Sequence, residues 1–202
     1  MKITPCSFRA LLICLSAALP FFPSALTAEK EKPAQEEHLS PFGLVYGPKG
    51  AFSIKAPEGW VIDNSSGLEQ RLPCVLYRKG DTWETAEPLM YAKIAGTDAT
   101  DHEAFAKKAI DEMTRERGDL RPKRIATGKT AGGEPYFVNE YLPTKAYPRS
   151  ERVAYIQLPK AVAYVVFSAD EKSTLKKHGS ALTQVLESFR AMSAKIDEEK
   201  AK

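Results

Sequence analysis

Short patterns in this sequence suggest chemistry, but each lacks part of the motif it would need. GKT at 128–130 has the end of a phosphate-binding loop, but Lys123 stands where that motif needs its first glycine. No helix is expected after it, so backbone N–H groups would not converge on a phosphate. STLK at 173–176 has the Ser-x-x-Lys spacing of penicillin-recognising enzymes, yet their Ser-Asp-Asn and Lys-Thr-Gly signatures are absent. We interpret the first as a strand and turn and the second as the start of a helix.

Other reactive residue types are scarce or isolated. Tyr141 and Lys145 have the spacing found in short-chain dehydrogenases, but the sequence lacks the glycine-rich dinucleotide turn that accompanies it. The three histidines are His38, His102 and His178, and the two expected on helices have no second ligand three or four residues further on. We therefore expect no metal, no cofactor and no catalytic residues.

The first 28 residues predict a secretory signal peptide. Lys2 and Arg9 precede an uncharged apolar run at 10–22, and small residues then lead to a cleavage site after Ala28. The run is shorter than the ~20 residues that span a bilayer. We expect an exported protein, periplasmic or extracellular, with no membrane span after cleavage. The alternative is an uncleaved N-terminal anchor.

Cleavage would change both charge and cysteine content. It removes two cations and no acid, so the formal charge falls from +3 to +1, which gives no electrostatic case for nucleic acid. Cys6 and Cys14 leave with the signal, so Cys74 cannot form a disulfide within the mature chain. Its strand-like context favours a buried apolar residue. A reactive thiol is the alternative.

Three further segments follow. Residues 29–41 are charged and nearly without apolar side chains, which predicts a flexible tether, and 191–202 predict a similar tail. Between them, 42–190 have the length and patterning of one domain. Its first strands are expected at 52–55, from Trp60 onward, at 73–80 and at 88–96.

The remaining pattern alternates helices with hairpins. A capping box of Thr100 and Glu103 begins a helix over 101–117, and Gly118 ends it. Hairpins are expected over 121–142 and 152–169, and a last helix over 171–190. The segment 161–167 is apolar at every position, which is typical of a strand covered on both faces. We predict an α+β fold: a mostly antiparallel sheet flanked by two helices in an α/β/α sandwich.

Two segments carry a resemblance to a known family. FSIKAPEGW at 52–60 resembles the start of PsbP-like domains, and YVVFSA with VLESFR, at 164–169 and 185–190, resembles their end. The resemblance spans Gly50 to Arg190 and implies an antiparallel sheet between helices. It also implies a non-catalytic role, as an extrinsic subunit, assembly helper or partner-binding module. The matching positions are packing positions, so no functional residue is transferred.

One pair of loops has the composition of a recognition surface. Trp83 lies in one, and Tyr147 and Arg149 lie in the other; aromatic and arginine side chains are enriched at interface hot spots. The alternative is that Trp83 only covers the edge of the sheet. We predict an exported, non-catalytic module that binds another envelope or secreted protein. The alternatives are a carrier with a ligand groove between sheet and helix, and a hydrolase whose site forms only in three dimensions.

Overall fold

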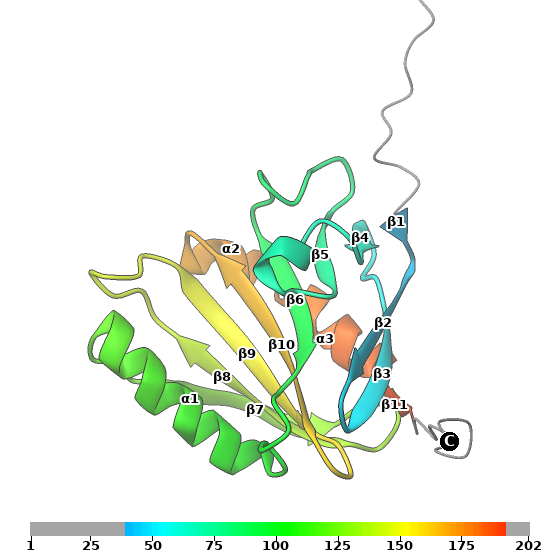
Figure 1. Cartoon of the computed structure of the whole chain (residues 1–202). Coiled ribbons are helices and arrows are strands. Elements are labelled where there is room, and N and C mark those ends of the chain that lie inside the picture. The colour runs from blue at the N-terminus through cyan, green and yellow to red at the C-terminus, as the bar shows by residue number, and fades with distance from the viewer. Residues whose placement is uncertain (1–38, 193–202) are drawn as a thin grey trace, which may run out of the picture. The chain divides into compact units, whose positions relative to one another are not determined.

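The computed structural model describes residues 39–192, which contain two β-sheets and three α-helices joined by turns and loops (Figure 1). The predicted signal peptide, most of the predicted tether and most of the predicted tail lie outside these residues. Strand β1 (Leu39–Ser40) lies within the predicted tether, and the predicted start of the tail at 191 falls inside β11 (Arg190–Met192), because these residues are paired with neighbouring strands.

The larger sheet has eight strands in the order β1-β4-β5-β6-β10-β9-β8-β7, and all neighbouring strands are antiparallel. Its strands are β1 (Leu39–Ser40), β4 (Trp60–Asp63), β5 (Val75–Arg78), β6 (Leu89–Ile94), β7 (Lys123–Lys129), β8 (Pro135–Tyr141), β9 (Ser150–Gln157) and β10 (Val162–Ala169). Both predicted hairpins are confirmed: β7 pairs with β8, and β9 pairs with β10.

A second sheet of three strands was only partly expected. It has the order β11-β3-β2, with β2 at Phe42–Gly47, β3 at Gly50–Lys55 and β11 at Arg190–Met192. The sequence predicted β3, whose Phe52 and Ile54 are buried, but neither of its partners. The inward positions of β2 include Gly43 and Gly47, which lie too close to neighbouring side chains for any larger residue.

Helix α1 spans His102–Arg117, as expected, but its N-terminal cap differs from the prediction. The Asp101 carboxylate accepts a hydrogen bond from the Ala104 N–H at 2.7 Å, so Asp101 is the capping residue and not Thr100. The helix ends at Gly118, whose φ of 89° is readily adopted only by glycine.

The last predicted helix is two helices, α2 (Lys172–Lys177) and α3 (Gly179–Ser188), which meet at His178. The break lies where the chain passes close to Arg152. A Cβ atom on Gly179 would be 2.9 Å from Arg152 Nη1, so this position accepts only glycine without rearrangement. The prediction of one continuous helix over 171–190 was therefore wrong at Gly179. The sequence does not show that the Arg152 side chain lies against this glycine.

The large sheet lies between two layers. Helix α1 packs on β9 and β10 from one side, in front of the sheet in Figure 1, and α2 contacts the same strands from the other. The small sheet and α3 complete the second layer: α3 contacts β3, and β2 contacts β4 and β6. The predicted α+β sandwich with a mostly antiparallel sheet is confirmed, with the small sheet as an unforeseen part of one layer.

Candidate binding surfaces

Trp83 lies in the loop between β5 and β6 and has two environments. It is half-buried against a small apolar cluster that includes Val75, Tyr77 and Ala86. It also lines an open cavity of about 590 Å³, together with Ser65, Ser66, Glu69, Gln70 and Glu84. Trp83 therefore covers part of the sheet and remains accessible from one side.

Arg149 connects the two loops that the sequence suggested as a recognition surface. Its guanidinium donates to Glu87 Oε2 at 2.9 Å, to Ser168 Oγ at 2.8 Å and to Asp170. Glu87 belongs to the loop of Trp83, so this ion pair holds the loops together. Because these contacts are all intramolecular, they engage the donors that a partner would need.

Tyr147 is likewise part of an internal network. Its hydroxyl donates to the buried carboxylate of Glu151 at 2.7 Å, and the Arg117 guanidinium lies 3.8 Å from the centre of its ring. Arg117 also pairs with Glu151 at 2.8 Å. Burial, followed by the charge of Glu151, raises the pKa of Tyr147 to about 12. Neither Tyr147 nor Arg149 lines the Trp83 cavity, so the three predicted residues do not share one open site.

Asp63 is a buried carboxylate at the end of β4 whose partners come from the following turn and from β5. It accepts hydrogen bonds from the hydroxyl groups of Ser65 at 2.7 Å, Ser66 at 2.6 Å and Tyr77 at 2.9 Å, and from two backbone N–H groups. Burial alone would raise the pKa of Asp63, but the hydrogen bonds from Ser66 and Ser65 outweigh burial and hold the pKa well below its ordinary value. The carboxylate therefore stays ionised and fixes the turn that follows β4.

Glu140, on β8, is a second buried carboxylate with cationic partners. It pairs with Arg152 at 3.1 Å and Lys172 at 2.8 Å. Burial opposes its ionisation, but the hydrogen bonds from Lys172 and Arg152 lower its pKa. The pair to Lys172 ties helix α2 to the large sheet. Within residues 39–192, no group of three or more His, Cys, Asp or Glu side chains is arranged to hold a metal ion.

The remaining reactive residue types occupy structural positions. GKT ends β7 and enters a turn, as predicted, and STLK lies in α2, where the Ser173 hydroxyl donates to Glu171 at 2.9 Å. Cys74 is a free and fully buried thiol, which confirms the expected burial. Burial raises its pKa to about 12, so the reactive thiolate is suppressed.

An exposed apolar surface covers the outer side of the small sheet, and the sequence did not predict it. On β2, Phe42, Leu44 and Tyr46 are 56%, 39% and 66% exposed, and on β11 Met192 is 44% exposed. The strand register places these side chains in rows: Phe42 beside Lys55, Leu44 beside Ser53 and Arg190, and Tyr46 beside Ala51 and Met192. We call this surface, with its cations Lys55 and Arg190, the β2 face.

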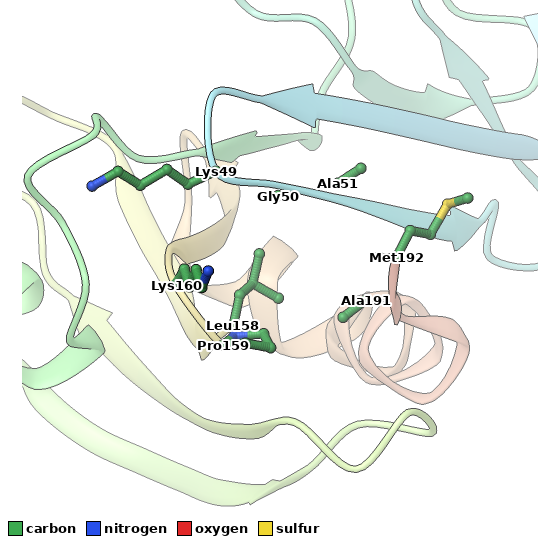
Figure 2. A pocket seen from close by; sticks show the side chains of 8 residues that line it. All are labelled: Lys49, Gly50, Ala51, Leu158, Pro159, Lys160, Ala191 and Met192. Carbon is green, nitrogen blue, oxygen red and sulfur yellow. The ribbon is translucent and has the colours of Figure 1, made fainter. Parts of the chain in front are cut away.

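A groove of about 410 Å³ lies at one end of the small sheet, next to the turn between β9 and β10. Figure 2 shows its lining: Lys49, Gly50, Ala51, Leu158, Pro159, Lys160, Ala191 and Met192. We call it the Lys49–Lys160 groove. It lies between strands β3 and β11 of the small sheet and the turn that joins β9 to β10, and not between sheet and helix as the carrier alternative expected.

Comparisons with known proteins support the fold. No family model and no curated protein matches the sequence. Among solved structures, cyanobacterial PsbP from Synechocystis sp. PCC 6803 is 14% identical, with 75% of this chain and 93% of that chain covered and a TM-score of 0.48. LpqN of Mycobacterium tuberculosis, described as involved in cell envelope biogenesis, is 16% identical, with 77% and 92% covered and a TM-score of 0.51. The chain is thus similar to LpqN in fold. A PsbP structure, from the family that the sequence resembles, is also among the matching structures.

Proposed function

We propose that this protein is an exported, non-catalytic accessory module that binds another envelope or secreted protein. Export follows from the predicted signal peptide at 1–28. No helix within residues 39–192 has the length and apolar character needed to cross a membrane. LpqN, which shares the fold, is involved in cell envelope biogenesis, and a similar setting suits this chain.

The β2 face is the single observation that carries the proposed mode of binding. Exposed apolar side chains gathered on one strand are typical of interaction sites, whereas scattered ones need no explanation. Phe42, Leu44 and Tyr46 alternate along β2 and all point outward. Aromatic side chains are enriched at the centre of protein interfaces.

The charges around the β2 face define the partner's chemistry. Lys55 lies 5.6 Å from the centre of the Phe42 ring, and Arg190 ends the row that contains Leu44. A partner surface with an apolar centre and acidic groups at its edge would match this arrangement. The proposed function is thus docking onto an acidic-rimmed apolar patch of another protein.

The absence of catalysis is also part of the proposal. Proton transfer needs an acid or base that is free to reach a substrate. The buried carboxylates of Asp63, Glu140 and Glu151 are each engaged by hydrogen bonds or cations. These contacts favour structural roles over the hydrolase alternative.

A photo-crosslinking amino acid at position 44 tests the docking proposal. Leu44 and Ile125 are both 39% exposed, so the same group at position 125 on β7 is a matched control. We expect one protein to be captured from position 44 in the intact envelope and not from position 125. That protein is then purified, and its dissociation constant is measured against the wild type, Leu44→Ser and Ile125→Ser.

Leu44→Ser should weaken binding at least about tenfold, which corresponds to about 1.4 kcal/mol. Ile125→Ser should leave it unchanged, and neither change should alter the melting temperature much, because both side chains already contact water. Equal capture from both positions, or undiminished binding by Leu44→Ser, would exclude the β2 face as the docking surface.

The carrier alternative is favoured by one observation, the Lys49–Lys160 groove. Its volume of about 410 Å³ falls within the range of about 300–1,000 Å³ that is usual for small-molecule sites. We keep ligand binding as a second candidate function.

A further inference from the structure

We propose that the Lys49–Lys160 groove binds one acyl chain of a long-chain carboxylic acid, with the carboxylate at the two lysines. This inference rests on the second candidate function. The groove shares Ala51 and Met192 with the β2 face, but not Leu44, the position used for crosslinking.

The lining of the groove has the two parts that such a ligand needs. Pro159, Ala191 and Met192 present apolar surface, and the buried side chains of Ala51 and Leu158 lie beside them. The lining also contains two cations, Lys49 and Lys160, and no acidic residue. A neutral apolar molecule would gain nothing from the two ammonium groups, and a cationic amphiphile would be repelled by them.

The apolar and charged parts lie at different ends of the groove. Figure 2 shows Lys49 and Lys160 toward one end and Met192 at the other, with Leu158 and Pro159 between them. Both lysines are exposed, so their ammonium groups keep their hydration until a ligand arrives. Lys49 donates one hydrogen bond to the Thr97 carbonyl, which leaves further donors for a carboxylate.

A carboxylate outside the lining reinforces this polarity. Glu134 reaches the β11 end from the turn between β7 and β8, where it accepts a hydrogen bond from the Ala191 N–H at 3.1 Å. Its charge disfavours a second carboxylate at that end. The acid group of the ligand is therefore directed to Lys49 and Lys160, and its chain toward Met192.

The size of the groove limits the ligand to one chain. A volume of about 410 Å³ is near the lower end of the range for small-molecule sites. One extended acyl chain can be covered by the lining, whereas a two-chain lipid would leave much of its apolar surface in water. Burial of each methylene favours binding, so a chain of moderate length gives measurable affinity.

Titration calorimetry of the exported chain with dodecanoate and with dodecanol tests both parts of the proposal. The double variant Lys49→Gln/Lys160→Gln should bind dodecanoate at least about tenfold more weakly than the wild type, because two ion pairs are lost. Its affinity for dodecanol should equal that of the wild type. Met192→Asp should weaken binding of both ligands, since it places a charge at the apolar end.

The matched control removes two charges elsewhere. Lys107→Gln/Lys176→Gln, on exposed positions of α1 and α2, should bind dodecanoate as the wild type does.

The proposal is overturned if dodecanoate does not bind, if the alcohol binds as tightly as the acid, or if the control loses as much affinity as the groove variant. Binding that appears only after residues 193–202 are removed would overturn it too, since the tail would then be the occupant. Association with phosphatidylglycerol vesicles without binding of dodecanoate would instead identify a membrane surface. In each case, failure leaves crosslinking at position 44 unaffected, so the two proposals are tested separately.

Discussion

Asp63 shows how a single buried charge shapes this molecule. Its carboxylate lies at the end of β4 and accepts hydrogen bonds from Ser65, Ser66 and Tyr77, which come from the following turn and from β5. A hydrogen bond to a charged group contributes about 1.5–3 kcal/mol. Because the folded state holds this carboxylate ionised, the stability of the protein depends on pH through this residue.

The sign of that dependence follows from the lowered pKa of Asp63. The pKa is below its ordinary value of 3.8 in the folded state, so the unfolded chain takes up the proton first. The stabilisation is fully present above about pH 5 and is lost as the pH falls through about 4 toward the folded pKa. Asp63→Asn should lower the free energy of unfolding at pH 7 by about 1–3 kcal/mol. On acidification, the free energy of unfolding of this variant should fall less than that of the wild type.

Urea unfolding of both proteins at a series of pH values gives the measurement. Asp111→Asn, on the exposed face of α1, is the control and should follow the wild type throughout. The free energy of unfolding is then plotted against pH for each protein. If the plots for the wild type and Asp63→Asn stay parallel from about pH 7 to about pH 3, this role for Asp63 is contradicted.

Residue types were easier to predict than residue partners. The sequence identified Cys74 as buried, because its neighbours are apolar, and identified GKT as a strand and turn from the residues that follow it. It could not show that Arg149 is paired with Glu87, since these residues are far apart in the chain and meet only through the fold. Composition alone therefore suggested a recognition loop where the structure has an internal ion pair.

At the scale of elements, strand β2 was missed from sequence because its large apolar residues do not point inward. A half-buried strand normally directs its large apolar residues inward. On β2 the large residues Phe42, Leu44 and Tyr46 point outward, while Gly43 and Gly47 lie inward against other side chains. The pattern of alternation was present, but nothing in it indicates which face is covered. Strand β11 has only three residues, too few for any periodicity.

The junction of α2 and α3 leads to a prediction about Gly179. In an ordinary helix, replacing glycine with alanine stabilises by about 1 kcal/mol. Here the new Cβ would lie 2.9 Å from Arg152 Nη1. That guanidinium cannot move freely, because it pairs with Glu140 and donates to the Leu175 carbonyl at 3.3 Å. We expect Gly179→Ala to lower the stability by about 1 kcal/mol instead of raising it.

A double-mutant cycle with Arg152→Met separates this clash from other effects. In the Arg152→Met background the obstructing group is gone, so Gly179→Ala should be neutral or stabilising. Urea midpoints of the four proteins provide the measurement. If Gly179→Ala has the same effect in both backgrounds, Arg152 is not the reason for the break between the helices.

At the scale of the whole molecule, the large sheet serves two apolar cores. Strand β10 supplies both: Val165 and Phe167 face the core shared with the small sheet, α2 and α3, and Val166 faces the one beneath α1. The sequence predicted this arrangement, since a strand that is apolar at successive positions has no face left for water. The sequence could not show that strands and helices share one of the covering layers.

Neighbouring residues of β10 provide a test of this three-layer arrangement. Val165 and Val166 are both buried, yet their side chains enter opposite cores. Replacing valine with threonine keeps the shape and adds a hydroxyl, which costs about 1–3 kcal/mol where no partner compensates it. We expect Val165→Thr and Val166→Thr to lower the free energy of unfolding by similar amounts within that range, whereas Ile125→Thr on the exposed strand β7 should cost much less. A negligible loss for either valine, measured by urea unfolding, would mean that its face of the sheet is open to water and that one covering layer is not in place.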